Sequence, residues 1–406
     1  MKTETPIDPC RRARRLSGIG LSEISQIGET VRTLKAEGKQ VISLGTGEPD
    51  FPTPAHVVDA AYKAAQDGQT LYTTTAGRID LRRAIAETTA RDCGFAPEAS
   101  EVIVTTGAKQ AIFNAFMATL DPSDEVILAA PFWASYADMI KVCEGRVVAV
   151  PTLASDGFRL KPEALRAAIT SRTRWLLLNS PGNPSGAVLS AADMKALGEV
   201  LRANPHVGVI SDEIYQHICY TEFTSFRAAV PDLADRTLII NGASKTYSMT
   251  GWRLGWGIGP KKLIDAMIAV QGQVTAGTSS ISQAAALAAL QVPQDFRQER
   301  CDDFRQRRDL VVAALNATGR IHCPVPDGAF YVFADCTCCF GLTSANGRNI
   351  ADDAVLCEAL LYEEGVALVP GRAFGLPGFF RLSYAYDVKS LTRACDAITR
   401  FCQALK

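Results

Sequence analysis

The chain has 406 residues, of which 47% are hydrophobic. This length indicates two or three domains, and the composition supplies enough apolar side chains to build their cores. Lysine and arginine total 42 against 43 aspartates and glutamates, so the net charge is −1. A balance of this kind excludes a global field that would attract nucleic acid or an anionic membrane. We therefore expect small molecules, or further copies of the chain, as partners.

The first residues carry a basic run, Arg11–Arg15 with one alanine in its middle. Gly, Ser and Glu follow it, where a secretory signal would need an apolar stretch. We expect residues 1–21 to form a solvated N-terminal arm. The longest apolar helical stretch, 281–290, is too short to span a membrane.

Twelve cysteines are scattered through the chain. A long chain without a secretory segment is not typical of a disulfide framework, so we expect reduced thiols and a cytoplasmic protein. Cys336, Cys338 and Cys339 lack the paired spacing of a zinc site and have no close histidine, so no metal is expected.

Residues 26–37 carry a helical pattern, with Ile27, Val31 and Leu34 on one face, and Gly38 ends it. A strand at 41–44 and the turn-rich stretch 45–50 follow. The glycines of that stretch could begin a dinucleotide-binding fingerprint, but proline and aspartate stand where its third glycine and helix belong. We reject a dinucleotide site here.

From about residue 54 to 295 strands alternate with helical patterns. Apolar runs indicate strands at 102–106, 125–128, 146–150, 174–179, 207–211, 237–241 and 256–259. Continuous apolar strands separated by amphipathic helices predict an α/β domain with a mostly parallel seven-stranded sheet and helices on both faces. Ligands bind such sheets at the carboxyl ends of the strands.

Polar loops follow four of these strands, at 107–109, 179–186, 211–215 and 244–253. Each loop taken alone could be ordinary turn chemistry. Because the ends of parallel strands meet at one side of a sheet, we expect the four loops to converge on one site.

After residue 295 a long charged helix leads to a turn at 324–329 and a strand at 330–333. A helix at about 350–363, strands at 365–369 and 380–384, and a final helix complete an α+β unit. We assign this unit, 296–406, together with residues 22–53 to a smaller domain built from both chain ends, and 54–295 to the large domain.

The loop at 244–253 carries the strongest chemical signal. A lysine most often lies in solvent, but Lys245 has Ser244 before it and Arg253 after it. A nearby cation and partial burial would lower the pKa of the amine, which must lose a proton to attack a carbonyl. The same arginine and serine suit a phosphate. A nucleophilic amine beside a phosphate clamp suggests pyridoxal 5'-phosphate as the cofactor. We expect this segment to form a loop at the edge of the sheet.

These residues resemble the fold-type I pyridoxal-phosphate aminotransferases of class I, specifically the bacterial aspartate aminotransferase subgroup. The resemblance runs from about residue 22 to the C-terminus. It rests on the ordered motifs GEPDF at 47–51, GAKQ at 107–110, NPSG at 183–186, SDEIY at 211–215, SKTYSMTGWR at 244–253, GAFY at 328–331 and FRLSYA at 380–385.

The resemblance implies a role for each matching residue around the cofactor. Lys245 would bind the cofactor as a Schiff base and carry the proton between the substrate α-carbon and the cofactor. Asp212 would face the ring nitrogen, and Tyr215 and Asn183 the ring's phenolic oxygen. Trp133 would stack on the ring. The phosphate would be held by Gly107, Ala108, Lys109, Ser244 and Arg253 and, from the partner subunit, by Tyr72.

For the substrate, the resemblance implies that Arg381 binds the α-carboxylate as a bidentate fork, helped by the Gly47 backbone, Trp133 and Asn183. Lys109 would lie near the distal carboxylate of aspartate. Ile24 stands where the subgroup usually has a short hydroxyl residue, and Glu23 beside it adds a negative charge to the substrate entrance. These two departures put the side-chain preference in doubt.

The resemblance thus implies a cytoplasmic homodimer with shared active sites that moves an amino group from an amino acid, L-aspartate first, to 2-oxoglutarate. The alternatives are an aromatic or other donor, β-elimination or decarboxylation with the same cofactor, and a non-enzymatic sensor domain. The sensor is disfavoured because no DNA-binding segment accompanies the fold and Lys245, Asp212 and Arg381 are all present.

Overall fold

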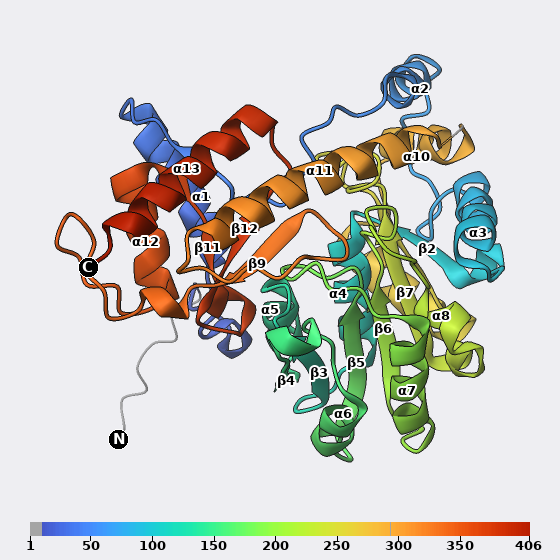
Figure 1. Ribbon diagram of the computed structural model, residues 1–406. Coiled ribbons are helices and arrows are strands. Elements are labelled where there is room, and N and C mark those ends of the chain that lie inside the picture. The colour runs from blue at the N-terminus through green and yellow to red at the C-terminus, as the bar shows by residue number, and fades with distance from the viewer. Residues whose placement is uncertain (1–9, 293) are drawn as a thin grey trace, which may run out of the picture.

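The computed structural model describes residues 10–292 and 294–406. A large sheet with its helices stands beside a smaller unit that holds the two ends of the described chain (Figure 1). The strands are β1 (Ile42–Ser43), β2 (Val102–Thr105), β3 (Glu125–Ala130), β4 (Arg146–Pro151), β5 (Thr173–Asn179), β6 (Gly208–Asp212), β7 (Thr237–Gly242), β8 (Gly255–Ile258), β9 (Tyr331–Asp335), β10 (Val366–Ala367), β11 (Val369–Pro370) and β12 (Phe379–Ser383).

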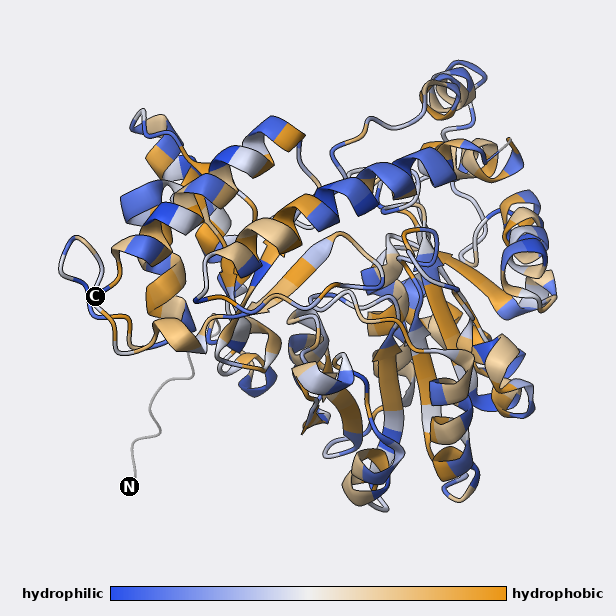
Figure 2. Ribbon diagram, viewed as in Figure 1, coloured by the Kyte–Doolittle hydropathy of each residue, from blue (hydrophilic) through white to orange (hydrophobic). Residues whose placement is uncertain are grey.

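The large sheet has seven strands in the order β2-β8-β7-β6-β5-β3-β4, and β8 alone runs against its neighbours. The prediction of a mostly parallel seven-stranded sheet is therefore confirmed. The residues of β2, β6, β7 and β8 are buried along their length, whereas the edge strand β4 is mostly exposed or half-buried. Figure 2 shows the strands as largely hydrophobic ribbons between helices with hydrophilic outer faces. Such runs are typical of a sheet covered on both faces.

Alternate strand residues pack into two separate cores, one on each face of the sheet. Val102 and Val104 belong to one core, while Ile103 between them belongs to the other. The first core also contains residues of α2, α3, α6, α7, α8 and α10, and the second contains residues of α4, α5 and α9. The period of two along a strand thus places helices on both faces.

The helices have the following bounds: α1 (Glu23–Ala36), α2 (Ala55–Gln66), α3 (Ile79–Cys93), α4 (Ala108–Thr119), α5 (Ser135–Val142), α6 (Pro162–Ala168), α7 (Ala191–Arg202), α8 (Phe226–Ala229), α9 (Lys261–Val274), α10 (Ser280–Gln291), α11 (Phe296–Ala317), α12 (Asp353–Glu364) and α13 (Val388–Ala404). Helix α1 begins earlier than its apolar spacing predicts, because the Ser22 hydroxyl accepts a hydrogen bond from the Ser25 amide and caps it.

The smaller unit contains a three-stranded antiparallel sheet, β11-β12-β9, and a parallel pair, β1-β10. The single strand expected at 365–369 is divided, since β10 pairs with β1 while β11 pairs with β12. The apolar sequence of this segment does not reveal that its two halves pair with strands of different sheets.

Helix α11 runs between the two units, along the side where they meet (Figure 1). One core cluster also joins them, since it contains Ile214, Tyr215 and Ile218 from the loop after β6 as well as residues of β9, α12 and α13. The domain boundaries at residues 53 and 295 stay a prediction. No helix among the described residues is long and apolar enough to cross a membrane.

Candidate active site

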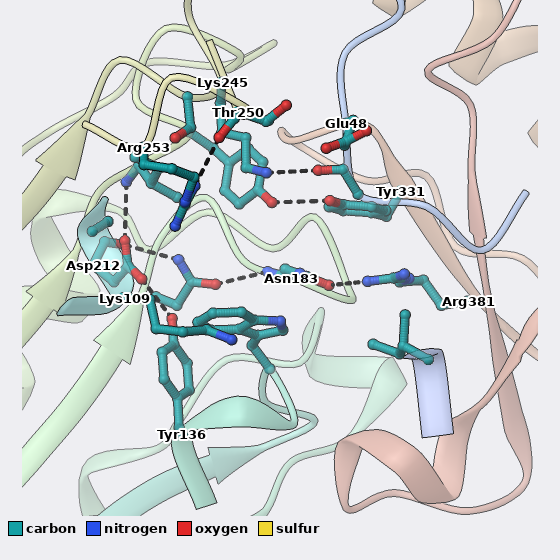
Figure 3. A pocket seen from close by; sticks show the side chains of 18 of the residues that line it. Glu48, Lys109, Tyr136, Asn183, Asp212, Lys245, Thr250, Arg253, Tyr331 and Arg381 are labelled. Carbon is teal, nitrogen blue, oxygen red and sulfur yellow. Dashed lines mark hydrogen bonds between the residues drawn. The ribbon is translucent and has the colours of Figure 1, made fainter. Parts of the chain in front are cut away.

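A cavity of about 480 Å³ opens at the carboxyl ends of the large sheet's strands, next to the smaller unit (Figure 3). Loops that follow β2, β5, β6 and β7 all contribute to its walls. It is lined by Ile24, Gly47, Glu48, Ala108, Lys109, Trp133, Tyr136, Asn179, Asn183, Asp212, Ile214, Tyr215, Ser244, Lys245, Thr250, Gly251, Arg253, Tyr331 and Arg381.

Lys245 enters the cavity from the loop between β7 and β8. This loop lies at the carboxyl end of β7, on the side of the sheet where the loops after β2, β5 and β6 converge. Lys245 Nζ donates a hydrogen bond to the Gly47 carbonyl at 2.6 Å. Burial lowers the pKa of Lys245 to about 8, against an ordinary value of 10.5. A useful fraction of the amine is therefore unprotonated near neutral pH.

Asp212 lies at the floor of the cavity, at the last position of β6, with 4% of its surface exposed. The Tyr136 hydroxyl donates to its Oδ2 at 2.7 Å, and the Ile214 amide donates to its Oδ1 at 3.2 Å. Burial raises the pKa of Asp212 to about 6, while these hydrogen bonds act in the opposite direction. A buried carboxylate of this kind favours a cationic partner.

The start of α4 forms a second wall. Gly107, just before the helix, has φ of +84°, and a Cβ there would lie 2.5 Å from Arg253 Nη2. A Cβ on Gly255 would lie 2.2 Å from the Ala108 amide nitrogen. The two glycines therefore let the helix start, with its free N–H groups, lie directly beside a guanidinium. This arrangement favours a phosphate.

Lys109 and Trp133 lie together on this side of the cavity. Lys109 Nζ is 4.7 Å from the Trp133 ring centroid and donates to Ser135 Oγ at 3.1 Å. Burial lowers the pKa of Lys109, and the charge of Arg253 lowers it further. The Lys109 side chain is thus partly exposed, and its ammonium group lies over an aromatic ring.

Arg381 reaches the cavity from β12 on the opposite side, with 1% of its surface exposed. Its Nη1 donates to Asn183 Oδ1 at 2.9 Å and its Nη2 to the Gly45 carbonyl at 2.5 Å. Its buried Nε has no hydrogen-bond partner among the described residues. A buried guanidinium with a remaining donor needs an anion, and a carboxylate matches its geometry.

Several lining residues were not among the sequence candidates. The Tyr331 and Tyr215 hydroxyls share a hydrogen bond of 2.9 Å, and the Tyr136 hydroxyl donates a hydrogen bond to Asp212. Both tyrosines stand in segments that the sequence already singled out, GAFY and the stretch after Trp133. Their contacts join distant segments, which spacing along the chain does not reveal. The remaining ones are Glu48, Asn179, Ile214, Thr250 and Gly251.

Two residues that the sequence predicted to lie at the site, Tyr72 and Glu23, do not line this cavity. Tyr72 is 97% exposed and lines a separate groove with residues 70–73 and 275–281. Glu23 points to Arg372, whose Nη2 donates to its Oε1 at 2.7 Å, so its charge is paired rather than presented to the substrate entrance. Ile24 does line the cavity, and it packs against the apolar cluster that contains Phe374.

The donor set fits pyridoxal phosphate. The N-terminus of α4, together with Arg253 and Ser244, suits its phosphate. The buried Asp212 carboxylate suits a protonated ring nitrogen. Tyr215 and Asn183 suit the phenolic oxygen of the ring. The amine of Lys245 lies between these groups and Arg381 (Figure 3).

Comparison with known proteins gives the same family. Residues 39–398 match the family model for aminotransferase class I and II. The chain is 51% identical to the aspartate aminotransferase of Rhizobium meliloti strain 1021, with 97% of this chain and 96% of the relative covered. It is 46% identical to the aspartate/prephenate aminotransferase of Cereibacter sphaeroides, with 96% and 98% covered.

The fold agrees as well. The crystal structure of the Rhizobium meliloti aspartate aminotransferase superposes on this chain with a TM-score of 0.95 at 50% sequence identity. The superposition covers 98% of this chain and 100% of the crystallised chain. The resemblance drawn from the motifs is confirmed: the chain belongs to the class I and II aminotransferase family and is a pyridoxal 5'-phosphate-dependent transaminase.

Proposed function

We propose that this enzyme is an aspartate aminotransferase, which moves the amino group of L-aspartate to 2-oxoglutarate. Relatives that carry this name cover nearly the whole chain. The observation that carries the proposal is the pair of cations on opposite sides of one cavity. The buried Arg381 has one donor, Nε, without a hydrogen-bond partner among the described residues, and Lys109 supplies a second cation for the distal carboxylate.

The bound pyridoxal phosphate supplies a carbonyl that condenses with amines and a ring that accepts electrons from the substrate α-carbon. The chain's own residues do the rest. Lys245 would anchor the cofactor and, once a substrate amine displaces it, Nζ would take the proton from the substrate α-carbon and deliver it to the cofactor. Its lowered pKa suits both tasks, because the amine must lose its proton to act as a base.

Asp212 would keep the ring nitrogen protonated, and Tyr136 and the Ile214 amide hold the carboxylate in place. Tyr215 and Asn183 would donate to the phenolic oxygen, and Trp133 would cover one face of the ring. The phosphate would be held by the amides of Gly107, Ala108 and Lys109 with Ser244 and Arg253.

Arg381 binds the α-carboxylate of either substrate, together with Asn183 and the backbone of Gly47. Gly45 and Gly47 belong to the stretch after β1, and the Gly45 carbonyl accepts from Arg381. Asn183 belongs to the loop after β5 of the large sheet. A carboxylate bound here contacts both units of the molecule, which gives binding a means to draw them together.

The same proposal includes a homodimer with shared active sites. Tyr72 is exposed and remote from its own cavity, and in this proposal its hydroxyl binds the phosphate in the partner subunit. Mixing inactive Tyr72→Phe and Lys245→Ala chains should restore some activity, because a hybrid dimer contains one site with both native residues. A monomer with full activity would contradict the shared site.

We place the enzyme in the cytoplasm. The cysteines from Cys93 to Cys402 are free thiols, as a reducing compartment allows. Fractionation of cells that express the chain, with the activity followed in each fraction, tests the location.

Glutamate formation from 2-oxoglutarate tests the reaction itself. We expect aspartate to be the best of a panel of amino donors, with glutamate and oxaloacetate formed in equal amounts. Release of ammonia or carbon dioxide without glutamate would instead indicate β-elimination or decarboxylation. Absence of any turnover would support a sensor.

Prephenate is a second candidate 2-oxo acid, favoured by the apolar Ile24 at the wall of a cavity large enough for a ring. Prephenate is therefore tested as the amino acceptor in the same assay, with aspartate as the amino donor. Faster turnover with prephenate than with 2-oxoglutarate would change the proposed acceptor and keep the proposed donor.

A further inference from the structure

Helix α11 presents a stripe of residues to the two segments that meet at Lys245. Arg297, Arg300, Phe304 and Arg307 are spaced by three, four and three residues, so they share one face of the helix. This face contacts the loop that carries Lys245 and the segment 50–53, which continues from Gly47.

Arg300 contacts both segments with one guanidinium group. Its Nη1 donates to Ser248 Oγ at 3.1 Å and to the Thr246 carbonyl at 3.4 Å. Its Nη2 donates to the Pro52 carbonyl at 2.8 Å. Two stretches almost two hundred residues apart in sequence are therefore joined through a single side chain.

Phe51 strengthens the same junction. Its ring centroid lies 5.0 Å from the Arg300 guanidinium and 5.1 Å from that of Arg307. Arg307 Nη1 also donates to both carboxylate oxygens of Asp50, at 2.7 and 2.8 Å. A direct bond joins the segments as well, since Thr53 Oγ1 donates to the Ser248 carbonyl at 2.7 Å.

The hydrogen bond from Lys245 Nζ to the Gly47 carbonyl spans this junction. Lys245 lies three residues before Ser248, and Gly47 lies five residues before Pro52. Beside Lys245 there is a void of about 10 Å³, lined by Lys245, Phe51, Arg300 and Phe304 among others. The position of the amine therefore depends on how firmly the two segments are held together.

We propose that Arg300 is a positioning residue for Lys245. It holds the loop at 244–253 against the segment at 47–53, so that the Lys245 amine stays aimed into the cavity. A small misplacement of a reacting group can cost up to about 100-fold in rate. The part of this inference that concerns turnover rests on the proposed aminotransferase function.

The test replaces Arg300 with methionine, which keeps an apolar stem and removes the three donated hydrogen bonds. We expect kcat for aspartate with 2-oxoglutarate to fall about ten-fold while the KM for aspartate changes less than about two-fold, since Arg381, the main donor to the α-carboxylate, belongs to β12 and not to either of the two joined segments. The second readout uses the full chain freed of cofactor. Acetylation of Lys245 by acetic anhydride is followed by mass spectrometry as a function of pH.

In the wild-type chain the midpoint of this acetylation is expected near pH 8. In Arg300→Met it should rise toward the ordinary lysine value, because a loosened loop lets water reach the amine. The charged groups around Lys245, namely Glu48, Arg381, Asp212 and Arg253, are the same in both chains. This readout requires no turnover, so it decides the inference even if the proposed reaction is wrong.

Arg308→Met is the matched control. Arg308 lies on the same helix, is partly buried like Arg300, and contacts Asp309, the Pro326 carbonyl and the Tyr220 ring instead of the two segments. It should leave both readouts unchanged. Equal losses in Arg308→Met would overturn the proposal, because they would reflect the stability of α11 in general.

If Arg300→Met does not fold, the same two measurements are made on Arg300→Lys. A lysine amine can contact one segment at a time but lacks the planar fork that joins both, so intermediate values are expected. Wild-type kcat together with a wild-type acetylation midpoint, in any folded Arg300 variant, would overturn the proposal.

Discussion

The floor and the mouth of the active-site cavity differ in how their charges meet solvent. At the floor, Asp212 is 4% exposed and its hydrogen bonds come from Tyr136 and a backbone amide. At the mouth, Lys109 is an exposed cation. An interaction with a buried charge is screened little, whereas water and salt weaken one at the surface. Changes at the floor should therefore affect catalysis strongly, and changes at the mouth should mainly adjust selectivity.

The largest effect is expected for Lys245→Ala. One positioned acid–base group contributes about 10²- to 10⁴-fold, and the anchoring of the cofactor is lost in addition. Turnover of aspartate should therefore fall by at least this factor, and the pH-dependent visible absorption band of the bound cofactor should disappear. Lys262→Ala, an exposed lysine in α9, is the control and should behave as the wild type. A visible band retained in Lys245→Ala would refute the assignment.

Asp212→Asn should lower turnover by about 10²- to 10³-fold, since removal of one partner of a buried ion pair costs about 3 to 5 kcal/mol. It should nevertheless stabilise the chain without cofactor. Burial raises the pKa of Asp212 from 3.8 to about 6, so the folded state binds this proton more tightly than the unfolded state. Stability from this group is present below about pH 4 and is lost as the pH rises toward 6.

Above pH 6 the asparagine variant should thus unfold with a free energy on the order of 3 kcal/mol higher than the wild type. Urea unfolding of the cofactor-free chains at pH 4 and pH 7 measures this difference. If the variant and the wild type were equally stable at pH 7, burial would not destabilise the ionised Asp212 carboxylate. The contrast between the floor and the mouth of the cavity would then lose its physical basis.

Lys109→Ala tests the mouth. We expect kcat/KM for aspartate to fall about ten-fold, the lower end of the range for a charge-assisted hydrogen bond, because the ammonium is exposed. For phenylalanine the change should be less than about two-fold. Lys141→Ala, an exposed lysine of α5 beyond the cavity, controls for a general loss of positive charge. Equal losses for both donors would mean that Lys109 serves the cofactor alone.

The smallest effect is expected for Tyr136→Phe, which removes one hydrogen bond to Asp212 and keeps the ring. That hydrogen bond lowers the pKa of the carboxyl, so its loss should raise the pKa further and weaken the charge at the floor. A fall in kcat of about two- to ten-fold is expected. Steady-state kinetics between pH 6 and 8 should show a larger deficit at the acidic end. A deficit independent of pH would indicate that Tyr136 only fills space.

The sheet was predictable because its signal is local. Strands such as Leu176–Leu178 are apolar without interruption, and glycine or proline marks the loops between them. The candidates from the loops after β2, β5, β6 and β7 all lie at or beside one cavity. The division of 365–369 between two sheets and the central position of β8 were not predictable, since both depend on which distant strand pairs with which.

By itself, the sequence determined the family and the cofactor and predicted the reactive amine, because these depend on ordered motifs and on the chemistry of single side chains such as Lys245. The tertiary structure decided the charge state and the surroundings of those side chains. The burial of Asp212, the pairing of Glu23 with Arg372 and the bridge from Arg300 arise from segments distant in the chain. Desolvation and hydrogen bonding act over a few ångströms in space, and spacing along the chain carries no measure of that distance.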